Sequence, residues 1–146
     1  MRKTIFVTII IFFPIIFFGQ NLASSGHVNH FPPTDLPGEK WHMCDHIRLS
    51  FIFGPNKYKE TITGIEFKWT MQDAFGDYLY SGKEKWGITI NSNEKSSHEK
   101  YLYWESCDIF SGGQEIYKKI KPLVSNTKVV VVITRIAFKD GKVLRF

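Results

Sequence analysis

The chain has 146 residues, of which 43% are hydrophobic, and its formal net charge is +5. This length allows one domain and excludes two ordinary ones. The lysines are scattered among acidic residues rather than gathered into a run, so the charge pattern argues against a nucleic-acid partner.

The first 23 residues have the layout of a secretory signal peptide. A short basic start is followed by an apolar run over residues 5–18 and then by small and polar residues, which predicts cleavage after Gly19 or Ala23. The apolar run holds about 14 residues, fewer than the roughly 20 of a membrane-spanning helix, and a retained N-terminal anchor is the alternative. We therefore expect a periplasmic or secreted protein with no stable membrane span after leader cleavage.

The folded domain is predicted to span residues 41–146. Residues 24–40 contain several Pro and Gly residues and no apolar periodicity, which indicates an extended N-terminal arm. Over residues 41–53, apolar residues alternate with polar ones, which is typical of a half-buried β-strand.

Four further segments show strand patterns and are separated by turn signals. They are residues 62–72, 78–80, 86–90 and 101–110. Residues 91–100 contain no apolar side chain, which indicates an exposed loop. Residues 114–123 place apolar side chains at helical spacing, and Pro122 would end any helix there, so we expect one or two helical turns.

The last long strand, residues 128–138, has apolar residues on both faces. Its run of β-branched residues favours a strand over a helix, and Asp140 and Gly141 suit the tight turn of a final hairpin. A strand that is apolar on both faces needs neighbours on either side, so it is predicted to be a central strand. Six to seven short strands indicate an all-β fold, an antiparallel β-sandwich, with an up-and-down barrel as the alternative.

Three segments also resemble parts of a known group of domains. Residues 62–67, 73–77 and 133–141 are similar to the strand and turn segments of small immunoglobulin-like accessory domains of bacterial envelope proteins, including FxLYD-type and neighbouring domains of unknown function. In such domains an early strand ends in an Asp-x-x-Gly-Asp hairpin and a late strand ends in Phe-x-Asp-Gly. The resemblance covers about residues 45–146. It implies an immunoglobulin-like sandwich that serves as a binding or scaffolding module.

Cys44 and Cys107 are the two cysteines of the chain. In an oxidising compartment an even pair of cysteines predicts a disulfide, here one that closes a loop of about 60 residues. The bridge is expected near a sheet edge or end rather than deep between the sheets. Two free thiols, each buried as a small apolar group, are the alternative.

No catalytic signature is found in the sequence. Gly-x-Ser-x-Gly, His-Glu-x-x-His, Cys-x-x-Cys and phosphate-binding glycine loops are absent from it. Asp73 and Asp77 flank Gly76, and a turn explains this pair better than a calcium loop does. We therefore expect a protein that is not an enzyme, with no catalytic residues and no cofactor.

The histidines suggest one possible metal site. On a strand, His42, Cys44 and His46 would project from one face, at a separation that suits zinc or copper. His27 or His30 would complete the set. An ordinary polar strand face shows the same spacing, and a disulfide would consume the thiolate of Cys44.

The aromatic residues suggest another class of site. Four tryptophans and four tyrosines are candidates for a platform that stacks against a sugar or for a protein-binding face. They are Trp41, Trp69, Trp86, Trp104, Tyr78, Tyr80, Tyr101 and Tyr103. Alternatively, most of these rings fill the core between two sheets. The sequence thus predicts an exported, non-enzymatic binding or scaffolding module of the bacterial envelope with an unknown protein or glycan partner, with metal binding and carbohydrate binding as alternatives.

Overall fold

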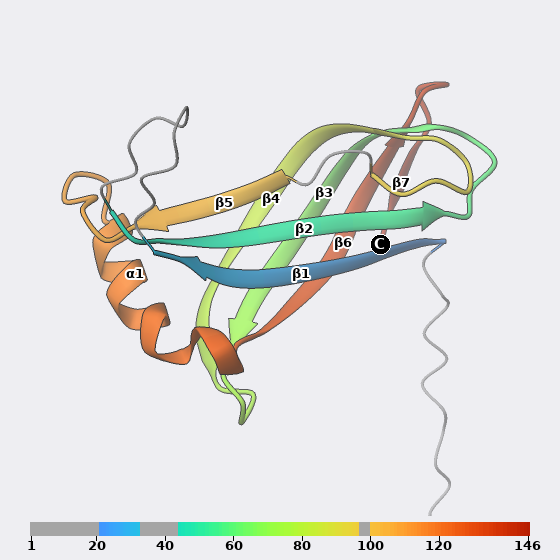
Figure 1. Ribbon diagram of the computed structural model, residues 1–146. Coiled ribbons are helices and arrows are strands. Elements are labelled where there is room, and N and C mark those ends of the chain that lie inside the picture. Colours follow the sequence, from blue (N-terminus) through green and yellow to red (C-terminus); the bar gives the residue numbers. More distant parts are fainter. Residues whose placement is uncertain (1–20, 33–43, 97–99) are drawn as a thin grey trace, which may run out of the picture.

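Two antiparallel β-sheets pack face to face in the computed structural model, which describes residues 21–32, 44–96 and 100–146 (Figure 1). The first sheet has the order β1-β2-β5, with β1 (Leu22–Phe31), β2 (His46–Asn56) and β5 (Lys100–Glu105). The second has the order β4-β3-β6-β7, with β4 (Tyr78–Ile90), β3 (Ile62–Gln72), β6 (Lys128–Phe138) and β7 (Val143–Arg145). The predicted immunoglobulin-like antiparallel sandwich is confirmed.

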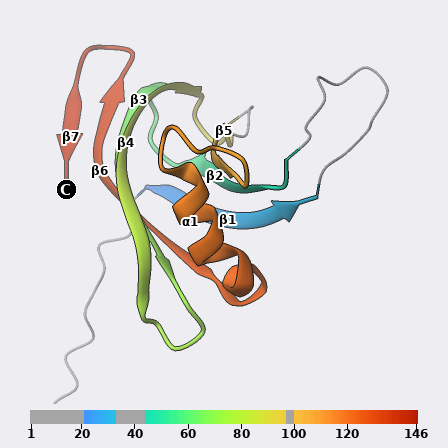
Figure 2. The same cartoon turned by 90° about the vertical axis from the view of Figure 1, so that its left-hand side faces the viewer.

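One short α-helix lies at an end of the sandwich. Figure 2 shows α1 (Gly113–Ile120) in front of the two sheets, followed by the 3₁₀-helix η1 (Lys121–Asn126). Pro122 lies in the first turn of η1, after the α-helix has ended, as the sequence predicted. Neither described helix has the length and apolar character that crossing a membrane requires.

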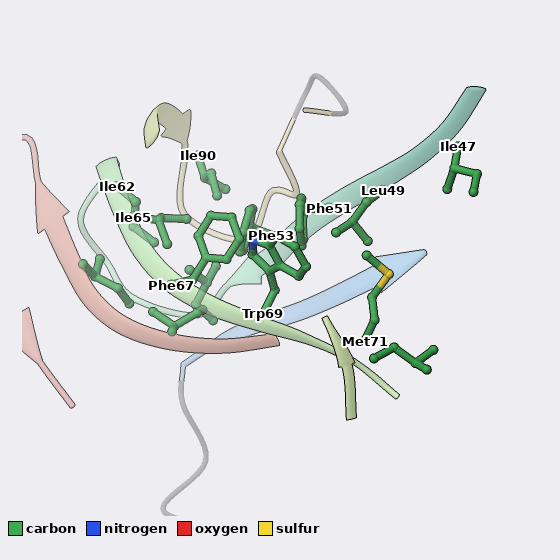
Figure 3. Close-up of a cluster of buried hydrophobic side chains, with 14 of the residues drawn as sticks. Ile47, Leu49, Phe51, Phe53, Ile62, Ile65, Phe67, Trp69, Met71 and Ile90 are labelled. Carbon is green, nitrogen blue, oxygen red and sulfur yellow. The ribbon is translucent and has the colours of Figure 1, made fainter. Parts of the chain in front are cut away.

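The core consists of the inward side chains of both sheets (Figure 3). In β2 the alternate residues Ile47, Leu49, Phe51 and Phe53 are all buried, which confirms the period-two prediction over residues 47–53. The strand begins at His46, and residues 41–43 of the predicted segment lie outside the described residues. Phe67 of β3 lies at the centre of the core. Its ring contacts Phe51 and Phe53 edge to face, at centroid distances of 4.9 and 5.0 Å.

Residues 24–31, predicted as part of an extended arm, instead belong to β1. Two of its inward positions carry small residues, so the segment has no apolar periodicity. At Gly26 an added Cβ would lie 2.5 Å from Val129 Cγ1, because β1 packs closely on β6 there. The Ser24 hydroxyl donates to the Val131 carbonyl at 3.5 Å. Leu22 begins the strand and is 1% exposed, so the sandwich includes residues before residue 41.

The two strands predicted at residues 78–80 and 86–90 form one continuous strand, β4. The intervening polar residues suggested a break, but they lie on an edge strand, where alternate side chains face solvent. Gly82 pairs with Trp69 of β3, and an added Cβ would lie 2.6 Å from Trp69 Cζ2. The glycine is therefore a contact surface for the indole rather than a turn.

Two further strands, β6 and β5, form where the sequence predicted strands, but β5 ends earlier than predicted. β6 lies between β3 and β7, which confirms its prediction as a central strand. Gly141 adopts a φ of 87° in the hairpin that follows it. β5 ends at Glu105, so Cys107 lies in the turn after the strand rather than within it.

Candidate functional site

Cys44 and Cys107 form a disulfide, with their Cα atoms 5.9 Å apart. The predicted bridge is confirmed, and its Cα separation lies in the usual range. It joins the segment before β2 to the turn after β5, at an end of the three-stranded sheet. The fold and this bridge define the chain as a disulfide-linked β-sandwich domain.

The described residues do not bring the predicted metal set together. Cys44 is bonded to Cys107 and offers no thiolate. His42 lies outside the described residues, and the His46 ring stacks on Phe31 at a centroid distance of 5.0 Å. Within residues 21–32, 44–96 and 100–146, no group of three or more His, Cys, Asp or Glu residues is placed to share a metal ion.

Asp45, next to the disulfide, holds α1 and η1 against the first sheet. Its Oδ2 accepts hydrogen bonds from the Tyr117 hydroxyl and from Lys121 Nζ, both at 2.8 Å, and His30 Nε2 lies 3.4 Å away. The Lys121 and Tyr117 hydrogen bonds lower the pKa of Asp45 from its ordinary 3.8 to about 2. The same contact with Asp45 raises the pKa of Lys121. This cluster therefore fixes the end of the sandwich that carries the helices.

Replacing Asp45 by Asn is expected to lower the free energy of unfolding by about 1–2 kcal/mol at neutral pH, because Lys121 loses its carboxylate partner. The folded-state pKa of Asp45 is depressed, so its contribution is present above pH 3.8 and is lost as the pH falls toward about 2. Urea unfolding across this pH range should show that the free energies of unfolding of the wild-type and Asp45→Asn chains converge at low pH. Asp77→Asn, an exposed control, should show no such convergence; parallel curves for Asp45→Asn would contradict the assignment.

Asp73 and Asp77 form a turn, as the sequence predicted. Asp73 Oδ1 accepts hydrogen bonds from the backbone N–H groups of Phe75 and Asp77, both at 2.9 Å. Gly76 has a φ of 88° there.

The tryptophans of the described residues are not an exposed platform. Trp69 is 3% exposed, and Trp86 and Trp104 are half-buried against the core, while Trp41 lies outside the described residues. The exposed rings near them are tyrosines: Tyr101 is 47% exposed and Tyr103 is 57% exposed. Aromatic surface is thus present on β5, but tyrosines provide it.

A groove runs along the open side of the sandwich, between β4 and β5. On the opposite side β1 packs against β6 and closes the sandwich. The groove has a volume of about 450 Å³ and is lined by residues of β3, β4 and β5. The Trp69, Tyr80 and Trp104 rings gather there, with centroid distances of 5.7 to 6.1 Å. Trp69 Nε1 is buried and has no hydrogen-bond partner in the described structure.

The outer face of the first sheet carries a second hollow next to this groove. It has a volume of about 150 Å³ and is lined by residues of β2 and β5: His46, Arg48, Tyr101, Tyr103 and Glu105. Arg48 Cζ lies 4.7 Å from the centroid of the Phe31 ring and 4.3 Å from that of Tyr101. This arrangement could not be predicted from the sequence pattern, because Phe31 belongs to a segment without apolar periodicity.

Comparisons with known proteins identify no family for the chain: no family model matches it, and no curated protein matches it. A solved structure described as "X-ray structure of Northeast Structural Genomics Consortium target SoR45" is similar with a TM-score of 0.38 and 10% sequence identity. That likeness covers 85% of this chain and 79% of the other. A likeness at this level supports no argument, and the resemblance to FxLYD-type domains stays a prediction.

Proposed function

We propose that this chain is an exported, non-enzymatic binding module that takes an extended segment of a partner protein along the free edge of β5. The observation that carries the proposal is the groove between β4 and β5. Its floor is aromatic, and two strand edges border it.

The edge of β5 supports binding through the backbone. β5 pairs with β2 along one side, and within the described residues the backbone of Tyr101 to Trp104 makes no hydrogen bond to any element other than β2. An edge strand with unpaired N–H and C=O groups accepts an added strand, and pockets for alternate side chains then select the sequence. A segment added here would extend the first sheet over the open side of the sandwich.

The groove supports specific contacts for the inward side chains of such a segment. The Tyr80 and Trp104 rings offer apolar surface, and the Trp69 ring packs against both of them. Apolar side chains of a bound segment would be buried against these rings, which favours binding.

Export rests on separate features. The leader-like layout of residues 1–23 predicts it, and a disulfide is typical of proteins in oxidising compartments. The proposed location is the periplasm or the exterior of the cell.

Filling the groove tests the proposal. Glu84 lines the groove from the inward side of β4, so a Trp side chain at this position would fill the groove. The partner that co-purifies with the wild-type full chain from its host, identified by mass spectrometry, is therefore expected to be absent from preparations of Glu84→Trp. Lys85→Trp is the matched control: this next residue is exposed, does not line the groove, and should leave the partner bound. Thermal unfolding of both variants checks that they fold. Retention of every partner by a folded Glu84→Trp variant would refute the groove as the site.

A further inference from the structure

Arg48 is held in a fixed position on the outer face of the first sheet. Its guanidinium lies between the Phe31 ring of β1 and the Tyr101 ring of β5, each within 5 Å of its Cζ atom (4.7 and 4.3 Å). Contacts between a guanidinium and aromatic faces are favourable and restrict the long side chain. The cation is thus preorganised.

The charge of Arg48 is not neutralised within the described structure. None of the ion pairs there includes Arg48, and its Nε is buried without a hydrogen-bond partner. Glu105 lines the same hollow but does not pair with it. A guanidinium whose donors lack acceptors favours an incoming anion, above all a planar carboxylate that it can bind with two hydrogen bonds.

The Arg48 guanidinium lies one strand away from the edge where the partner segment is proposed to lie. Arg48 belongs to β2, the central strand of the sheet, and one of the two rings that hold it, Tyr101, belongs to the edge strand β5. Neighbouring strands lie about 4.8 Å apart, and alternate side chains of an added strand point to the outer face. A Glu side chain on that face would reach the hollow beside Tyr101 and Tyr103.

We infer that the partner segment carries an acidic residue on its outward face and that Arg48, between Phe31 and Tyr101, binds its carboxylate. This inference rests on the proposed function, since it assigns the chemistry of the segment bound at β5. The segment would then alternate apolar residues, which face the groove, with at least one acidic residue, which faces Arg48.

Two end-blocked octapeptides test this inference by calorimetry with the full chain. One alternates Val and Glu, and its twin alternates Val and Gln, so that they differ only in charge. The wild-type chain is expected to bind the Glu peptide about tenfold more tightly than the Gln peptide at low salt. Arg48→Met should remove this preference. Arg48→Lys should keep part of it, because the ammonium keeps the charge but not the planar pair of donors.

The outcomes separate this inference from the proposed function. The inferred contact between Arg48 and an acidic residue is overturned if the wild-type chain binds both peptides equally. It is also overturned if a folded Arg48→Met variant still prefers the Glu peptide. Either result leaves the proposal of strand binding at β5 intact. Binding of neither peptide at millimolar concentration would overturn both. Binding of free glucuronate through Arg48 without binding of the Glu peptide would assign the site to an acidic sugar and also overturn the inference.

Discussion

Replacing Cys44 by Ser is expected to lower the free energy of unfolding by about 2–4 kcal/mol under oxidising conditions. The bridge links residues 63 positions apart and ties the start of β2 to the end of β5. Its loss enlarges the ensemble of unfolded conformations, which is the main source of stabilisation by a disulfide in the chain-entropy description. Denaturant unfolding followed by circular dichroism measures the change.

Reductant provides the control for this prediction. With reductant present, the wild-type chain loses the bridge, so Cys44→Ser should then cost much less. Cys107→Ser should reproduce the effect of Cys44→Ser, and the double variant should add little to either. Equal destabilisation with and without reductant would mean that the cysteines act through packing.

Replacing Phe67 by Ala is expected to lower the free energy of unfolding by about 3–5 kcal/mol. The ring is completely buried and packs against Phe51, Phe53 and Trp86, the last at a centroid distance of 4.9 Å. Its removal leaves a cavity between the two sheets that these aromatic neighbours fill only partly. Thermal and denaturant unfolding should both report the loss.

Two further substitutions calibrate the effect. Phe67→Leu keeps most of the buried volume and should cost clearly less than Phe67→Ala. Val132→Ala, in β6, removes methyl groups from a side chain that is 50% exposed and should change stability little. A small effect for Phe67→Ala would contradict its place at the centre of the core.

The strands that the sequence predicted are those that bury one continuous apolar face. β3 was predicted with its observed bounds, since alternate side chains over residues 62–72 face the core. β1 was not predicted because its inward face carries Ser24 and Gly26, where close packing on β6 replaces apolar side chains with small ones. Periodicity detects buried area and does not detect such a contact.

The candidate site could not be predicted from the sequence, because its residues are brought together by the register and order of the strands. Arg48 and its two aromatic neighbours come from three strands, and only the register of the sheet places Phe31 and Tyr101 on either side of it. The groove depends on the open side of the sandwich, which follows from strand order rather than from a motif. The disulfide needed only two cysteines and an oxidising compartment, so the sequence sufficed for it.

The burial of Leu22 bears on where the mature protein begins. Leu22 pairs with Asn56, is almost completely buried, and is preceded by Asn21, whose carbonyl accepts a hydrogen bond from the Lys57 N–H at 2.6 Å. A leader peptidase that cut after Ala23 would remove both residues from the folded domain. A cut after Gly19 would leave them in place. If the leader is cleaved as we propose, the folded sandwich therefore favours the earlier processing position, and the mature N-terminus becomes part of the architecture rather than a free tail.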